Sequence, residues 1–183
     1  AYILTLISKS TDSQTSFGNG NVNTAARLIT GGLKDKGAFY GYNDNTHQVK
    51  CLWSEGIWGD LRDWTNGFTI TPEGDIKIKN YAPYSFSNFT NYQTLETLSS
   101  DKSGYLKSAK ITENGILGDD LSGSSSTYFC DYLYLYKSSD NYFPSVGGSY
   151  SYGSRSGLFC LSCVCSVSLS YSYIGASPFF VNP

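Results

Sequence analysis

The sequence predicts an α+β fold of short strands, two short helices and much irregular structure. Charged residues make up only 15 % of the chain and aromatic residues 16 %, with 16 tyrosines, and this composition favours strands over helices. Nineteen glycines, together with many serines and asparagines, indicate frequent turns. Because 183 residues suffice for one ordinary core and no linker or internal repeat is visible, we expect a single domain over 1–183.

The first third of the chain is expected to hold both helices. A strand is predicted at 2–7 (YILTLI), and a short helix at 24–30 (TAARLIT) that Asn23 or Thr24 would cap. Two strand-like pieces flank the turn signal NDN within 38–53. A second short helix is predicted in GIWGDLRDWTNGF, 56–68, where the spacing would bring Trp58, Leu61 and Trp64 to one side. Together with Trp53, these tryptophans are expected in the core.

The clearest single element is a hairpin in FTITPEGDIKIKNY, 68–81. Apolar residues alternate on both sides of the turn Thr71-Pro72-Glu73-Gly74. The following stretch, 81–127, is rich in Asn, Ser and Gly and is expected to be irregular. A strand is predicted in 127–137, alternating around Phe129, Leu133 and Leu135, and a loop in 137–149.

Charge and hydropathy exclude two classes of partner. The net charge is -2 and no Lys/Arg stripe exists, so the electrostatic footprint of a nucleic-acid binder is missing. No apolar run is long enough to cross a bilayer. The opening AYILTLIS has neither a basic leader nor a cleavage pattern, so we do not interpret it as a signal peptide. Because the initiator Met is missing, we expect a fragment or a processed chain.

No motif for catalysis, a cofactor or a metal stands out. The five cysteines include a C-x-x-C-x-C run, Cys160, Cys163 and Cys165, but Cys51, Cys130 and the single histidine, His47, supply no second pair for a zinc site. We expect His47 at the surface rather than beside a thiol nucleophile. The acidic residues Asp60, Asp63, Asp119 and Asp120 form no calcium-loop motif. Phosphate-loop, dinucleotide and serine-hydrolase signatures are also missing.

The C-terminal segment 147–175 has an unusual residue alphabet. In SVSLSYSYIG, 166–175, serine occupies every second position while the positions between differ in chemistry. The residues at these mixed positions are Tyr, Arg, Cys, Ser, Val and Leu, and each is reached from an asparagine codon by changing only its two adenines. This pattern is genetic rather than structural. Periodicity alone would instead place Val167, Leu169, Tyr171 and Tyr173 on the apolar face of a half-buried strand.

This segment resembles the variable region of proteins that retroelements diversify through adenine-directed mutagenesis. Three further stretches, YILTLISKSTDSQTSFGNGNVNTAA, DKGAFYGYNDNTHQVK and GIWGDLRDWTNGF, look like the framework of phage and prophage members. The interval from Trp58 to Trp64 is one residue longer than the common form of the family. The resemblance runs from about residue 2 to residue 176 and is weakest over 81–127.

The resemblance implies a C-type lectin-like fold, related to that of the formylglycine-generating enzyme, with a variable region at about 148–175. The variable, ligand-binding side chains would stand at the mixed positions, Tyr150, Tyr152, Arg155, Cys160, Ser162, Val164, Cys165, Val167, Leu169, Tyr171 and Tyr173. The fixed scaffold would include the residues Trp53, Trp58, Trp64, Gly148, Gly157, Phe159, Leu161, Ile174 and Gly175, and Cys163 stays unassigned. Strand alternation would turn Phe159 and Leu161 inward and Cys160 and Ser162 outward.

The expected function is therefore non-catalytic ligand binding. The resemblance implies a receptor-binding protein of a phage tail or prophage, at the virion or cell surface, whose partner is a protein or glycan on a host cell. Tyrosines would supply rigid amphipathic contacts and Arg155 a charged anchor. Several copies on a virion would add avidity. The alternatives are a formylglycine-generating-type oxidase, a calcium-dependent lectin and a structural tail-fibre subunit.

Overall fold

Strands in four sheets dominate the computed structural model, which describes residues 12–24, 26–29, 31–51, 54–113 and 115–175. The largest sheet has the order β14 (Ile174–Gly175), β4 (Arg62–Trp64), β12 (Phe143–Val146), β13 (Leu161–Cys165), β11 (Tyr132–Leu135) and β8 (Lys102–Tyr105). The three smaller sheets contain β1 (Phe39–Tyr40), β2 (Lys50–Cys51) and β3 (Ser54–Glu55); β5 (Phe68–Ile70), β6 (Asp75–Ile78) and β7 (Gln93–Thr97); and β9 (Ser108–Thr112) with β10 (Gly115–Asp120).

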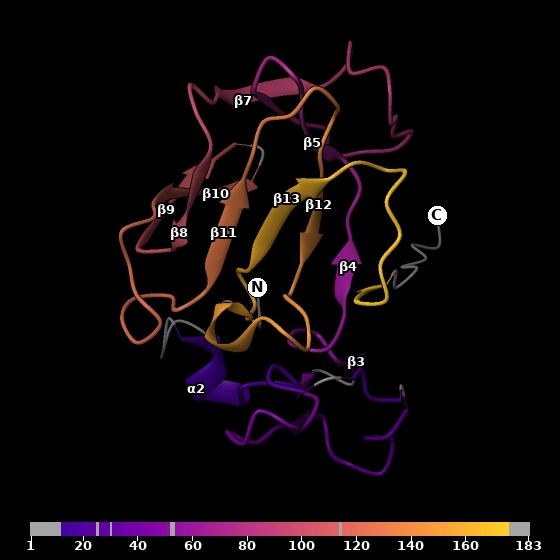
Figure 1. The fold of residues 1–183 in the computed structure, drawn as a ribbon, viewed down its shortest axis with the longest axis vertical. Coiled ribbons are helices and arrows are strands. Elements are labelled where there is room, and N and C mark those ends of the chain that lie inside the picture. The colour runs from indigo at the N-terminus through magenta and orange to yellow at the C-terminus, as the bar shows by residue number, and fades with distance from the viewer. Residues whose placement is uncertain (1–11, 25, 30, 52–53, 114, 176–183) are drawn as a thin grey trace.

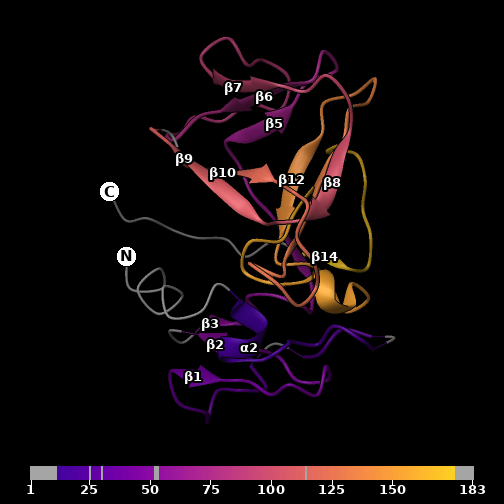
Figure 2. The same cartoon turned by 90° about the vertical axis from the view of Figure 1, so that its left-hand side faces the viewer.

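The smaller sheets surround the six-stranded sheet on three sides. Figure 1 shows β11, β13, β12 and β4 side by side, with β5 and β7 above them and α2 (Ser13–Phe17) and β3 below. In Figure 2 the β9–β10 hairpin lies on one side of this sheet, while the chain leading from β13 to β14 runs on the other. Among the described strands, those outside the large sheet therefore cover one of its faces and leave the other without strands.

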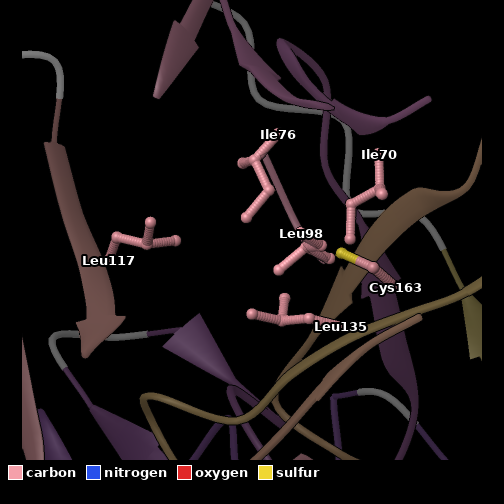
Figure 3. Packing of buried hydrophobic residues seen from close by; sticks show 6 residues of the cluster. All are labelled: Ile70, Ile76, Leu98, Leu117, Leu135 and Cys163. Atoms are coloured by element: carbon pink, nitrogen blue, oxygen red, sulfur yellow. The ribbon is translucent and has the colours of Figure 1, made fainter. Parts of the chain in front are cut away.

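The core lies on the covered face. Ile70, Ile76, Leu98, Leu117, Leu135 and Cys163 form one buried cluster (Figure 3). These side chains come from β5, β6, β10, β11 and β13, and Leu98 directly follows β7. Since side chains alternate along a strand, the residues next to Leu135 and Cys163 in β11 and β13 point to the opposite face.

Several expected elements are confirmed. The hairpin of 68–81 is β5 and β6, paired antiparallel through Phe68 and Ile78. Its turn is closed by a 2.8 Å hydrogen bond from the Gly74 amide to the Thr71 carbonyl, and Gly74 has φ 93°, which only glycine adopts readily. The strand pair around NDN is β1 and β2, and the strand of 127–137 is present as the shorter β11.

The helix predicted at 24–30 is wrong for its described residues, 24 and 26–29, which form no helix. The buried carboxylate of Asp60 holds this segment instead, because it accepts hydrogen bonds from the Leu28 amide at 2.9 Å and from the Asn21 side chain at 2.8 Å. A short helix, α2, forms earlier in the chain, at Ser13–Phe17, where the sequence predicted no helix. Asp12 caps it by accepting from the amides of Gln14 and Thr15.

The helix predicted in 56–68 is also wrong, since Arg62–Trp64 forms strand β4 between β12 and β14. Tertiary hydrogen bonding overrides the local helical spacing here. Asp60 and Asp63 therefore do not lie in a helix, and Trp58 and Leu61 do not share a helical face with Trp64. Trp58 is still a core residue, 1 % exposed, whose indole N–H donates to the Gly18 carbonyl, whereas Trp64 is half-buried.

The middle of the chain is more ordered than its composition indicates. Strands β7, β8, β9 and β10 lie within 81–127, and β12 lies within the expected loop 137–149. The described part is thus mostly β with one short α-helix, which is compatible with an α+β class. The strand predicted at 2–7 and the scaffold residue Trp53 lie outside the described residues.

Candidate functional site

The face of the six-stranded sheet that points away from the core carries a group of aromatic and basic side chains. We call it the aromatic face; its members are Tyr105, Tyr132, Tyr134, Tyr136, Tyr152, Tyr173, Arg62 and Arg155. Register places them together, because Tyr105 pairs with Tyr132 and Tyr134 pairs with Ser162. Along β11 the half-buried Tyr132 and Tyr134 alternate with the buried Leu133 and Leu135.

Five of the six tyrosines of this face form a continuous chain of ring contacts. Tyr105 meets Tyr132 edge-on at a centroid distance of 4.9 Å, and Tyr132 lies 4.5 Å from Tyr134. Tyr134 in turn contacts Tyr136 at 6.1 Å and Tyr152 at 5.9 Å. Edge-to-face and tilted pairs of this kind are favourable and fix ring orientation, so the surface is preorganised before any ligand arrives.

Arg62 lies at one end of the aromatic face, near Tyr152 and Tyr173, and is 2 % exposed. Its guanidinium lies 5.2 Å from the Tyr152 ring and 4.7 Å from the Tyr173 ring. Nη1 donates hydrogen bonds to the Tyr152 hydroxyl at 2.7 Å and to Ser162 Oγ at 3.1 Å. Two of the predicted variable tyrosines are thus positioned by a buried cation from β4.

Arg155 lies at the other end, in the short 3-10 helix η1 (Gly153–Arg155), and is exposed. Its Nη1 donates a 2.6 Å hydrogen bond to the Tyr134 hydroxyl, and its guanidinium lies 5.8 Å from the Tyr132 ring. The hydrogen bond to Tyr134 raises the pKa of Arg155. Burial raises the pKa of Tyr134 and of Tyr152, so both phenols are neutral at physiological pH.

The segment 166–173 borders the aromatic face and contains no strand. Val167, Leu169 and Tyr171 are 53 %, 38 % and 41 % exposed. The alternative that these residues form the apolar side of a half-buried strand is therefore not observed. Tyr171 stacks on the half-buried Tyr173 with parallel rings 4.9 Å apart, which joins the segment to Arg62.

Three residues expected to face solvent do not. Cys160 and Ser162 are 1 % exposed and Cys165 is 4 % exposed. Ser162 does point to the aromatic face, as its register with Tyr134 requires, but the Arg62 side chain covers it. The expectation that these three positions are open to a ligand is wrong, because the surrounding chain buries all three side chains.

The remaining predicted positions are half-buried. Tyr150 and Val164 each keep part of their surface. The Tyr150 hydroxyl lies 3.3 Å from Ser172 Oγ, and its backbone amide donates to the Asp60 carbonyl at 2.9 Å. Tyr150 therefore links the segment 166–173 to the loop that precedes β4.

The predicted scaffold residues hold this arrangement in place. A Cβ at Gly157 would lie 1.7 Å from Asp131 Oδ1, and one at Gly148 would lie 2.3 Å from Ser156 Oγ. Leu161 packs against the core cluster, and Phe159 meets Phe129 edge-on at 5.2 Å. Ile174 and Gly175 form β14, which pairs with β4 beside Arg62.

Asp131 is a buried carboxylate that contacts the predicted scaffold residues Gly157 and Phe159. It is fully buried and its Oδ2 accepts a 2.8 Å hydrogen bond from the Phe159 amide, while Oδ1 has no hydrogen-bond partner. Burial raises the pKa of Asp131 well above its ordinary value. The close fit of Gly157 against this carboxyl explains why no larger residue fits there.

The cysteines and acidic residues form no reactive group among the residues that the structure describes. All five cysteines are free and buried, and burial raises the pKa of Cys160, Cys163 and Cys165. No set of three or more His, Cys, Asp or Glu residues in this part lies close enough to hold a metal ion. His47 is at the surface, as expected, and pairs with Asp44 at 2.6 Å. The described helices are all too short or too polar to span a bilayer.

Sequence reasoning missed Arg62 and the tyrosines of β8 and β11. A signal existed for the latter, since Tyr132, Tyr134 and Tyr136 recur with the period of two that places side chains on one strand face. No sequence pattern indicates Arg62 as a site residue, because the local spacing predicts a helix there and its partners are 90 and 100 residues away in sequence.

Known proteins offer no relative from which a role for these side chains can be transferred. No protein-family description, curated protein or solved structure matches this chain.

Proposed function

We propose that this chain is a non-catalytic ligand-binding domain with a C-type lectin-like fold. Its C-terminal surface would be diversified by adenine-directed retroelement mutagenesis, and its role would be host recognition by a phage or prophage. The observation that carries the proposal is the exposure of Val167, Leu169 and Tyr171 in a segment outside every strand. A scaffold tolerates unrestricted side chains only where they bury little on folding.

The physical basis of binding would be desolvation of preorganised aromatic and apolar side chains. Interfaces are enriched in Tyr and Arg, and the residues that dominate their energetics lie in well-packed pockets near the centre of the interface. Tyr152 and Tyr173 are fixed by Arg62, and Tyr171 is stacked on Tyr173. Little side-chain entropy would then be lost on binding. Display of several copies on a virion would raise the overall avidity.

The proposal is tested by exchanging only the exposed apolar side chains of the segment. The triple variant Val167→Asn, Leu169→Asn, Tyr171→Asn replaces all three with one polar residue. A matched control, Ile29→Asn, Tyr81→Asn, Ile111→Asn, removes three side chains that are more than 80 % exposed elsewhere. Labelled proteins are then compared by flow cytometry on a panel of bacterial hosts.

We expect the first variant to lose or change its host preference, while the control binds as the parent does. Unchanged binding of both variants across a panel that the parent recognises would contradict the proposal and favour a structural tail subunit. The genetic part has its own test in the neighbouring DNA. We expect a near-copy of the coding sequence for 147–175, with adenines at the mixed positions, beside a reverse transcriptase gene.

A further inference from the structure

Arg62 and Arg155 differ in their partners from five of the nine lysines that the structure describes. Lys50, Lys77, Lys102, Lys107 and Lys110 each lie within 4 Å of a carboxylate oxygen. Among the described residues neither arginine of the aromatic face forms such an ion pair. Each donates to a tyrosine hydroxyl instead, Arg62 to Tyr152 and Arg155 to Tyr134. The face therefore carries two positive charges that the described part of the chain does not neutralise, although the whole chain has a net charge of -2.

The burial of Arg62 without an ion-pair partner among the described residues is unfavourable in free energy. The guanidinium is 2 % exposed, and its Nε has no hydrogen-bond partner. A buried charge is ordinarily paired, because its lost hydration is otherwise uncompensated. Neutral phenols offset only part of that loss through hydrogen bonds and ring contacts. A carboxylate arriving near this face would supply the missing negative charge.

The exposed apolar residues of the segment 166–173, which reaches Arg62 through the Tyr171–Tyr173 stack, indicate the class of molecule that would bring the carboxylate. Val167 and Leu169 are exposed aliphatic side chains, and Tyr171 adds an exposed ring. Aliphatic surface is complementary to the apolar side chains of a polypeptide rather than to a hydroxyl-covered sugar. Aromatic residues and Arg around such a patch are the composition of protein-binding hot spots.

We propose that the aromatic face recognises an acidic, aromatic-containing segment of a protein partner. Arg155 is the accessible group that pairs with an Asp or Glu side chain of that partner. Tyr105, Tyr132, Tyr134 and Tyr136 extend the contact surface beyond the variable region, and Arg62 is a positioning residue for Tyr152 and Tyr173. The inference rests on the proposed binding function and adds to it the chemistry of the ligand.

The test measures binding of the full chain to polymers of stated composition by fluorescence anisotropy. The probes are a Glu/Tyr copolymer, a Lys/Tyr copolymer and polygalacturonate, which is an acidic glycan. Four proteins are compared: the parent, Arg155→Gln, Arg155→Lys and the exposed control Lys34→Gln. Arg155→Gln keeps a donor for Tyr134 and removes the charge, so it separates charge from local structure.

We expect the Glu/Tyr copolymer to bind the parent and the Lys34→Gln control equally. Arg155→Gln should weaken that binding about tenfold, the loss of a charge-assisted contact worth about 1.4 kcal/mol. Arg155→Lys should restore most of it, and about 0.5 M salt should weaken it. Three results would each overturn the inference. In the first, the parent does not bind the Glu/Tyr copolymer at all; in the second, Arg155→Gln binds it as tightly as the parent; in the third, polygalacturonate binds through Arg155 more tightly than the copolymer does.

Failure here is distinguishable from failure of the proposed function. If the Val167, Leu169 and Tyr171 exchange alters host binding while the Glu/Tyr copolymer does not bind, the acidic-partner inference is wrong and the binding function stands. If the copolymer binds through Arg155 while the same exchange leaves host binding unchanged, the proposed function is wrong.

Discussion

The guanidinium of Arg62 donates a 2.7 Å hydrogen bond to the hydroxyl of Tyr152, 90 residues away in sequence. This contact joins β4 of the six-stranded sheet to the proposed variable region, and Tyr152 is therefore oriented by a residue outside that region. On the proposed function, a residue of the scaffold would thus determine how a variable side chain is presented.

Removing that hydroxyl should cost stability. Tyr152→Phe deletes the acceptor of a hydrogen bond from a buried charge, which we expect to lower the free energy of unfolding by about 1.5 kcal/mol. Tyr171→Phe is the matched control, since no hydrogen bond of its hydroxyl occurs within the described residues, and it should change stability by less than about 0.5 kcal/mol. Urea denaturation of both variants checks this. Equal effects of the two changes would contradict the role assigned to Arg62.

The contact between Gly157 and Asp131 should make position 157 intolerant of any side chain. A Cβ there would lie 1.7 Å from Oδ1 and 2.4 Å from Cγ of Asp131, so Gly157→Ala should destabilise the chain by about 3 kcal/mol or more. The exposed Gly37 has no atom within 4 Å of an added Cβ, and Gly37→Ala should be nearly neutral. Thermal unfolding followed by circular dichroism compares the two. A Gly157→Ala protein with the parent's melting temperature would refute the tight fit.

Because of Asp131, the free energy of unfolding should decrease as pH rises. Its pKa is raised in the folded state by burial, so the folded chain holds the proton that the unfolded chain loses near its ordinary pKa of about 3.9. The contribution of Asp131 to stability is full below that pH and is lost as pH rises towards the raised folded pKa, at up to about 1.4 kcal/mol per pH unit.

The measurement is the difference in unfolding free energy between the parent and Asp131→Asn, from about pH 4 upwards. Asparagine keeps an acceptor for the Phe159 amide and does not titrate. The parent should lose stability relative to this variant as pH increases. A difference that is constant with pH, or that changes in the opposite direction, would show that Asp131 is not held protonated.

The cysteines should be inert in the native protein. All five are buried, and burial raises the pKa of Cys130 to about 11, so the reactive thiolate is scarce at neutral pH. With Ellman's reagent at pH 8 we expect no fast-reacting thiol in the folded chain and five in guanidinium chloride. Rapid reaction of Cys160 or Cys165 before unfolding would revive the oxidase alternative.

Local signals predicted the elements that depend on neighbouring residues. The β5–β6 hairpin follows from Gly74 and the alternation around it, and β11 follows from Leu133 and Leu135. β4 could not be predicted this way, because its partners, β12 and β14, lie far along the chain and compete with a helical spacing. Short strands such as β7 to β10 are similarly specified by pairing rather than by composition.

The site was predicted only in part, because the sequence does not show which distant residues contact one another. The residue alphabet of 147–175 identified exposed positions such as Val167, Leu169 and Tyr171, which need no partner. It did not identify Cys160, Ser162 and Cys165 as buried, because burial depends on parts of the chain distant in sequence, such as Arg62 over Ser162. Codon chemistry carries no information about which outward-pointing side chains another part of the molecule covers.

The place of β13 in the sheet has a consequence for biosynthesis. It lies between β11 and β12 and pairs with both, yet it follows β4, β8, β11 and β12 in the sequence. A nascent chain therefore exposes two unjoined half-sheets until the ribosome has released residues 161–165, and these edges need protection from aggregation. Translation that stops before Leu161 should yield an insoluble product rather than a smaller working protein.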